Sequence, residues 1–211
     1  MKYSMLLIFS LVFSAAGHAK THDWQLKKQV NGIKVQQQKT DSGYPITRGS
    51  MQIDASLDAL ITLVRDNSAC SRWLFSCKQS RLIKQYNPRT RLDYAVIDSP
   101  FVFADRDLYT FTELTFDQAT QTALVRISGR EAHDKGQPGR VRIKNIQGFW
   151  SMKKLSANKT LLIYQIYNNP QLKASSFLNN HLVDSVFYTL RNLAAVSKEA
   201  KYRNARLTEL K

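Results

Sequence analysis

The sequence predicts an α+β fold in which a curved antiparallel β-sheet wraps around a long C-terminal α-helix. One helical pattern ends the chain, and a series of alternating apolar segments joined by short turns precedes it. The chain has 211 residues, 43% of them hydrophobic, which is enough for one domain with a sizeable core. No internal repeat or low-complexity block divides it.

The C-terminal helix is expected between positions 170 and 197. Its apolar residues fall within one arc of about 140°, and they are Leu172, Leu182, Val183, Val186, Phe187, Leu190, Leu193 and Ala194. Ser175, Ser176 and Asn179 share this arc near the start of the helix, where a packed core would need larger apolar groups. We expect this end of the helix to line a space. Capping of a frayed first turn explains the same three residues equally well.

The expected strands occupy residues 24–30, 33–38, 46–53, 80–85, 91–97, 106–116, 122–129, 140–152 and 161–167. Asn31-Gly32 marks a tight hairpin turn, and Asp54 or Ser56 caps a helix that carries Leu57, Leu60, Ile61 and Val64 on one face. Within 140–152 the apolar phase shifts by one residue, which we interpret as a β-bulge that bends the sheet around the last helix.

Residues 1–19 have the pattern of a signal peptide. Lys2 precedes an apolar run from Met5 to Ala16, and Gly17-His18-Ala19 resembles a cleavage site. The run is short for a bilayer span, and no Cys follows it to carry a lipid anchor. We expect a mature protein that is soluble and periplasmic or secreted, with a domain over 20–203 and a tail over 204–211.

Export bears on Cys70 and Cys77, because close thiols usually pair in an oxidising compartment. A disulfide is the favoured reading, ahead of free thiols. A metal site is the least favoured, since two thiolates supply half of a tetrahedral zinc shell. We expect no metal and no cofactor.

The net charge of +15, from 31 Lys and Arg against 16 Asp and Glu, suits a polyanion or an anionic bilayer. For an exported protein we favour phospholipid headgroups over nucleic acid. A basic, solvated surface without a partner accounts for the charge as well.

Five segments resemble a START domain, the StAR-related lipid-transfer module, in its exported bacterial form. They are WQLKKQVNGIKV, IDASLDALITLVRDNSACSRW, CKQSRLI, DYAVIDSPFVFADRDLYTFT and FLNNHLVDSVFYTLRNL. The resemblance spans nearly the whole mature chain. It implies a helix-grip fold that encloses a tunnel for one lipid between the sheet and the C-terminal helix, and a carrier in place of an enzyme.

The resemblance also assigns residues. Arg106-Asp107 matches the family's RD pair, for which we expect a structural ion pair or turn, and Phe177-Leu178-Asn179 matches the start of the gripping helix. Sterol-carrying relatives place an acidic and a basic residue in the tunnel; Asp93 matches the acidic one, whereas Thr112 stands at the basic position. Lys173-Ala174 replaces the Pro usual near the helix start.

Two loops, 98–105 and 131–140, are candidates for the tunnel mouth. Phe101 and Phe103 either pack under the sheet edge, which we favour, or contact a membrane. Basic residues around the second loop could hold it to anionic headgroups, and these are Arg126, Arg130, Arg140, Arg142 and Lys144. The lipid-binding candidates are Asp93, Phe101, Phe103, Thr112, Ser175, Ser176, Asn179, Val183, Val186 and Phe187.

The leading interpretation is a monomeric carrier of one lipid that contacts an anionic membrane transiently. A helix-grip enzyme, either a cyclase or a hydrolase of a hydrophobic substrate, is the first alternative. Asp93 is its best candidate base, because His181 is expected on the outward face of the helix. A basic envelope binding protein with a filled core is the second alternative.

Overall fold

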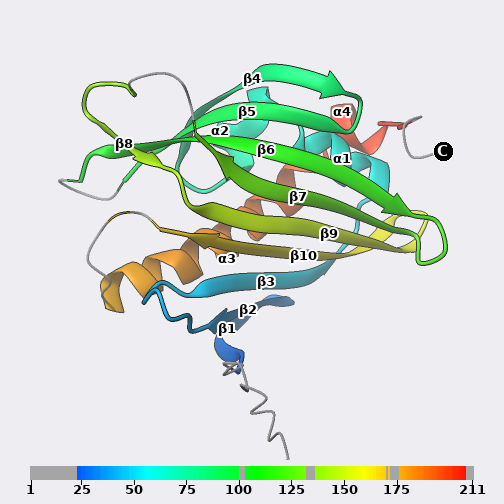
Figure 1. Cartoon of the computed structure of the whole chain (residues 1–211). Helices are drawn as coiled ribbons and strands as arrows, with labels where there is room; N and C mark the ends of the chain where they lie inside the picture. Colours follow the sequence, from blue (N-terminus) through cyan, green and yellow to red (C-terminus); the bar gives the residue numbers. More distant parts are fainter. Residues whose placement is uncertain (1–22, 100–102, 132–135, 170, 172–175, 208–211) are drawn as a thin grey trace, which may run out of the picture.

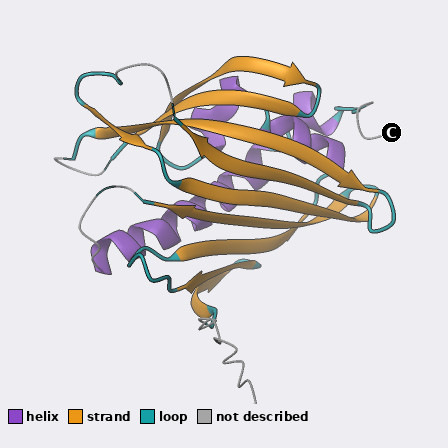
Figure 2. Ribbon diagram, viewed as in Figure 1, coloured by secondary structure: helices purple, strands orange, loops and turns teal. Residues whose placement is uncertain are grey.

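A computed structural model describes residues 23–99, 103–131, 136–169, 171 and 176–207, with only the backbone described at 176–178. In this part of the chain ten strands form one sheet, and the described helices all lie on one face of it (Figures 1 and 2). We call this the inner face and the opposite side the outer face. The arrangement confirms the α+β, helix-grip prediction.

The strands are β1 (Gln25–Val30), β2 (Ile33–Gln38), β3 (Ile46–Ile53), β4 (Cys77–Asn87), β5 (Thr90–Ile97), β6 (Asp105–Asp117), β7 (Thr122–Arg130), β8 (Arg140–Ile143), β9 (Ile146–Ser156) and β10 (Lys159–Asn168). The helices are α1 (Leu57–Val64), the 3-10 turn η1 (Asn67–Ala69), α2 (Cys70–Trp73), α3 (Ser176–Val196) and α4 (Ala200–Arg203). The short helices η1, α2 and α4 are additions to the sequence-based expectation.

The order of the strands joins distant parts of the chain. The main path runs β1-β2-β3-β10-β9-β7-β6-β5-β4, all antiparallel, so β3 pairs with the last strand and not with its successor in sequence. The first hairpin turns at Asn31 and Gly32, whose φ angles of 49° and 77° fit the expected tight turn. Strands β1 and β4 are the two edges of the sheet.

The prediction of one bulged strand over 140–152 was wrong. The chain forms two strands here: β8 pairs with β6 in parallel, whereas β9 pairs with β7 and β10. The phase shift in the sequence therefore marks the step from one neighbour to another. Lys144 and Asn145 make this step, and Asn145 O accepts a hydrogen bond from Asn169 N.

Helix α3 packs against the β1–β3 part of the sheet, where its apolar arc is buried. Val186 and Leu190 lie over Gly49 on β3, and a Cβ added to Gly49 would come within 2.6 Å of each of them. The absence of a side chain on Gly49 thus allows the helix to approach the sheet closely. On the edge strand, Lys28 Nζ pairs with Asp184 at 2.8 Å and lies 4.2 Å from the centre of the Phe187 ring.

The remaining helices cover the other half of the inner face. Ser56, and not Asp54, caps α1, because its hydroxyl accepts a hydrogen bond from Ala59 N. Helix α4 is held against η1 through Tyr202, which is fully buried and donates to Asp66 Oδ2 at 2.8 Å. The inner face is therefore covered by α3 on one half and by these shorter helices on the other half.

Candidate functional site

A cavity of about 130 Å³ lies on the inner face, between the sheet and the segment formed by the end of α1, η1 and α2. Its floor consists of side chains from β5, β6, β7, β9 and β10. Trp150 and Tyr164 stack face to face with ring centres 3.9 Å apart, and Trp73 meets Trp150 edge-on at 5.8 Å. Aromatic rings from α2 and the sheet therefore form one wall of the cavity.

The other walls are mostly aliphatic. The apolar residues at the end of the cavity near the loop after β5 are Ile97, Leu108, Ile146 and Ile166. Tyr164 is buried within this floor, and burial raises the pKa of its hydroxyl, which is therefore protonated at neutral pH. Most of the cavity surface is suited to hydrocarbon.

The opposite end of the cavity is polar and charged. Asp93 is buried, and its Oδ2 lies 2.8 Å from Arg91 Nε at ion-pair distance, although the angle is not that of a hydrogen bond. Asn67 Nδ2 donates to Asp93 Oδ1 at 2.9 Å and to Ser80 Oγ at 2.7 Å. Arg91 also donates to the carbonyl of Arg65 through Nη1. Every member of this network lines the cavity.

Burial raises the pKa of Asp93, and this effect outweighs the opposing influence of Arg91 and of the hydrogen bond from Asn67. The polar end thus holds a charged pair that is poorly solvated. A ligand group that hydrogen-bonds to Asp93 or to Arg91 replaces hydrogen bonds to water that these side chains lose on burial.

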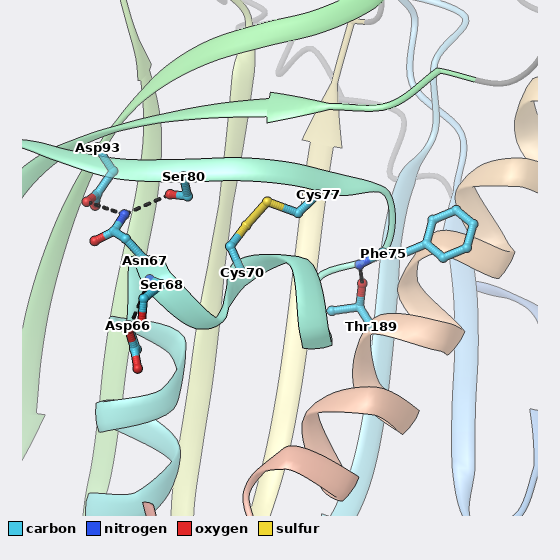
Figure 3. Close-up of a disulfide and its surroundings, with 9 residues drawn as sticks. All are labelled: Asp66, Asn67, Ser68, Cys70, Phe75, Cys77, Ser80, Asp93 and Thr189. Carbon is cyan, nitrogen blue, oxygen red and sulfur yellow. Dashed lines mark hydrogen bonds between the residues drawn. A yellow bond between two sulfur atoms is a disulfide. The ribbon is translucent and has the colours of Figure 1, made fainter. Parts of the chain in front are cut away.

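Figure 3 shows how the disulfide positions the helical wall of the cavity. Cys70 at the start of α2 is bonded to Cys77 at the start of β4, with Cα atoms 5.9 Å apart, which confirms the predicted pairing. Beyond the bond, Phe75 N donates to Thr189 Oγ1 on α3 at 3.1 Å. One short segment therefore connects the sheet edge, the cavity wall and α3.

Of the ten lipid-binding candidates, only Asp93 and Thr112 line this cavity as described. Thr112 lies directly across from Arg91 in the register of β5 and β6. The basic group absent at Thr112 is thus present on the neighbouring strand. Arg91 precedes Asp93 by two residues, so strand alternation could have placed both side chains on the same face of the sheet.

The candidates on α3 lie elsewhere. Val183, Val186 and Phe187 are buried in the core over β1–β3, and none of them appears in the lining of the cavity under α2. Asn179 is half-buried, and its Oδ1 is buried without a hydrogen-bond partner in the described part of the chain. A lipid-binding role for these four residues stays a prediction. Ser175 and the side chain of Ser176 lie outside the described residues.

The described ends of the two candidate mouth loops lie at the same end of the sheet as β8 (Figure 1). Lys78 pairs with Asp98 at 2.7 Å and with Asp105 at 3.0 Å, so it holds both ends of the first loop together. Phe103 is 40% exposed, and the expectation that it packs under the sheet edge was wrong. Phe101 lies outside the described residues.

Arg106 and Asp107 both have structural roles, as expected, but with separate partners. Arg142 holds Asp107 through two hydrogen bonds of 2.7 and 2.8 Å, and Tyr94 donates to Asp107 as well. Arg106 donates to Ser99 Oγ and to the carbonyl of Ala104. The two side chains diverge because neighbours on a strand face opposite sides of the sheet.

The basic residues expected around the second loop separate into two groups. Arg142 is bound to Asp107, Arg140 donates to Tyr94, and Lys144 lies 3.7 Å from Glu131. Arg126 and Arg130 instead lie exposed on the outer face of β7.

The histidine prediction needs a correction. His181 is half-buried and packs edge-on against Phe75, with ring centres 5.6 Å apart. Burial lowers its pKa, while Asp184 acts in the opposite direction. It does not line the cavity, and His22 and His133 lie outside the described residues.

No family model matches this chain. An uncharacterized protein of Pseudomonas aeruginosa is 27% identical over 199 residues, which cover 92% of this chain and 96% of that protein. A STAR-related lipid transfer protein from Xanthomonas axonopodis superimposes with a TM-score of 0.75 at 22% identity, over 83% of this chain and 99% of the other. The chain has the START fold.

Human StAR-related lipid transfer protein 5 shares the START fold with this chain at a TM-score of 0.74 and 15% identity, covering 83% and 86% of the two chains. A Streptomyces aromatase/cyclase is a weaker match, with a TM-score of 0.51 at 10% identity over 74% and 96%. Among the described residues, no helix is both long and apolar enough to span a bilayer.

Proposed function

We propose that this protein binds and transfers a single hydrophobic or amphipathic lipid on its inner face. The observation that carries the proposal is the cavity on the inner face, which has apolar and aromatic walls and a charged pair at one end. The START fold supports it, because two solved structures that share this fold are named as lipid transfer proteins.

The cavity suggests how the lipid lies. The Asp93–Arg91 pair and Asn67 suit a hydroxyl or another small polar group, since they offer both a hydrogen-bond acceptor and donors. The hydrocarbon part then extends toward Ile97 and Ile166, near the candidate mouth. Each buried CH₂ contributes about 0.8 kcal/mol, so binding needs no covalent chemistry.

Lipid binding requires the site to expand. A cavity of about 130 Å³ resembles one that holds benzene, whereas drug-sized ligands occupy roughly 300–1,000 Å³. The segment η1–α2 over the sheet is the part that can move away, because its two helices have only three and four residues.

The same proposal includes the location of the protein and its partners. We propose a monomeric periplasmic or secreted carrier that loads lipid at the loops 98–105 and 131–140 while it contacts an anionic membrane. The disulfide supports an oxidising compartment, and exposed Phe103 at the first loop supports membrane contact.

The cavity gives less support to the alternatives. An enzyme needs a positioned base and a partner group, but the described lining contains no histidine, and its two carboxylates are already bound, Asp66 by Tyr202 and Asp93 by Asn67. A binding protein with a filled core is disfavoured by the cavity itself.

Native mass spectrometry of the protein purified from its host tests the proposal, and we expect one co-purifying lipid per chain. Ala95→Leu, which fills the cavity, should reduce lipid occupancy severalfold, whereas Ala119→Leu in an exposed turn should not. An empty wild-type protein that also fails to take up fluorescent lipid analogues would contradict the proposal.

A further inference from the structure

The outer face of the sheet is unusually apolar for a surface that none of the described helices covers. In Figure 1 the helices lie behind the sheet, so this face is toward the viewer. The outward side of a half-covered antiparallel sheet normally carries polar residues. Here the central strands place large half-buried apolar side chains outward, namely Phe111, Leu124, Phe149, Leu161 and Ile163.

Part of this face is hollowed. A depression of about 470 Å³ crosses β6, β7, β9 and β10. Phe111, Phe149 and Tyr167 contribute aromatic rings to it, and Arg126, Arg130 and Gln147 contribute hydrogen-bond donors. Glu113 is the one acidic residue in its described lining.

The two arginines of the hollow form no ion pair with any carboxylate in the described part of the chain. Arg130 lies over the Phe111 ring, with its guanidinium carbon 4.5 Å from the ring centre. Arg126 is exposed and faces Glu113 across the β6–β7 register. Among the described residues, neither arginine has a carboxylate within ion-pair distance. Both therefore remain available to an external anion.

Further cations extend the same face toward the β4 edge. Arg81 lies 5.1 Å from the centre of the Tyr94 ring, and Lys84 lies 4.9 Å from that of Tyr86. Both side chains belong to exposed residues, and neither forms an ion pair with a described carboxylate. Cations thus surround an apolar and aromatic centre on one face of the protein.

We propose that this outer-face hollow is a docking site for an anionic phospholipid bilayer, with a headgroup phosphate between Arg126 and Arg130. An apolar centre with cationic groups around it is the chemistry that binds the interface of an anionic membrane. A second copy of this chain fits poorly, because each copy has a net charge of +15 and would bring cations against cations.

The site is separate from the cavity, because the sheet lies between them. Docking on the outer face consequently does not require the inner cavity to hold a lipid. From their sequence positions, Arg126 and Arg130 were expected to surround the second mouth loop. The proposal places them instead on a broad membrane-facing surface.

Vesicle flotation at 0.1 M salt tests the proposal with the full chain. We expect binding to vesicles of phosphatidylcholine and phosphatidylglycerol (7:3) and little binding to phosphatidylcholine alone. Each arginine near an anionic surface contributes about 5-fold in affinity, so Arg126→Gln/Arg130→Gln should weaken binding about 25-fold. The matched control is Lys198→Gln/Arg203→Gln, which removes the same charge from exposed positions near the C-terminus.

Equal weakening by the two double variants would show that net charge alone drives binding and would overturn the proposal. The proposal would also be overturned if wild-type protein bound soluble polyphosphate but not the anionic vesicles, because the occupant would then be a free polyanion. Absence of binding to either probe would also overturn it and leave an acidic protein as the partner. Native mass spectrometry of the same samples measures independently how much lipid the cavity holds.

Discussion

At the scale of single residues, the polar end of the cavity depends on buried charges that neutralise each other. Arg91 and Asp93 have side chains that are 10% and 8% exposed, and the Nε of Arg91 lies 2.8 Å from Oδ2 of Asp93. Removing one of them leaves the other without its counter-charge in a poorly hydrated site. The free energy of unfolding should therefore change differently when one member of the pair is replaced and when both are replaced.

Asp93→Leu should lower the free energy of unfolding by about 3–5 kcal/mol, because it leaves the Arg91 guanidinium buried and unpaired. The double variant Arg91→Met/Asp93→Leu should recover most of this loss. Urea denaturation of the wild type, the single variant and the double variant measures both values. A double variant no more stable than Asp93→Leu would contradict the account.

Asp66 makes stability depend on pH. Burial alone would raise the pKa of Asp66, but hydrogen bonds from Lys201, Ser68 and Tyr202 together hold it well below its usual range. A lowered pKa in the folded state stabilises the protein above the ordinary pKa of about 4, and this contribution is lost as the pH falls through the folded-state value.

Asp66→Asn should therefore cost about 1–3 kcal/mol at pH 7 and progressively less below pH ~4. Thermal unfolding of both proteins between pH 7 and pH 3 measures the narrowing difference. Tyr202→Phe is the control, because it removes one of the three hydrogen bonds that lower the pKa of Asp66 and keeps the carboxylate, so the pH dependence should become smaller without disappearing. A difference that stays constant down to pH 3 would show that the charge of Asp66 is not responsible.

At the scale of elements, the sequence predicted regular segments well and short or irregular ones poorly. The Asn31-Gly32 hairpin and α3 have strong local signals, a turn pair and a helical apolar arc. Helix α2 consists of the four residues Cys70–Trp73. It is too short to show any periodicity in the sequence. The space for a ligand was expected at the start of α3, because Ser175, Ser176 and Asn179 share its apolar arc, whereas the described cavity lies under α2.

The division of β8 from β9 was missed for a related reason. A one-residue change of phase is the same in the sequence whether the strand bulges or ends. The parallel pairing of β8 with β6 depends on contacts between distant residues, which alternation does not encode. The Arg91–Asp93 pair, in contrast, could have been predicted from alternation alone.

The packing of α3 on β3 gives a prediction at Gly49. Gly49→Ala should destabilise the protein by about 1–3 kcal/mol, because the new methyl group meets Val186 and Leu190 at 2.6 Å or less. Chemical denaturation measures it, with Ser50→Ala on the opposite face of the same strand as a control that changes little. Equal effects of the two substitutions would show that α3 does not rest tightly on β3.

The disulfide gives a prediction for α2. Cys70→Ser/Cys77→Ser should lower stability by about 2.5 kcal/mol, the value expected for a loop of this short length. Denaturation of wild-type protein with and without reductant should show the same loss, while reductant should leave the variant unchanged. Identical stability of oxidised and reduced wild-type protein would contradict the predicted stabilisation by the disulfide between α2 and β4.

At the scale of the whole molecule, the sheet separates two surfaces with different tasks. The inner face holds the cavity and the outer face holds the basic hollow, so lipid carriage and membrane docking are proposed for opposite sides. Substitutions in the hollow should weaken vesicle binding without altering the residues that line the cavity.

Lipid binding should also stabilise the whole fold. A ligand that binds only the folded state, at about 100 times its dissociation constant, adds about 2.7 kcal/mol to the free energy of unfolding. Delipidated protein should therefore unfold at a lower temperature than reloaded protein in differential scanning calorimetry. Ala95→Leu is the control, and a rise of similar size in that variant would place the lipid outside the cavity.

The pairing of β3 with β10 has a consequence for biosynthesis. Thr47 on β3 meets Ile166 on β10, so the first three strands leave the ribosome long before their neighbour exists. Such distant pairings form slowly because a long loop must close first. Until the final third of the polypeptide is made, the sheet stays in two unjoined pieces, and a chaperone or translocation machinery has that interval in which to engage the nascent chain.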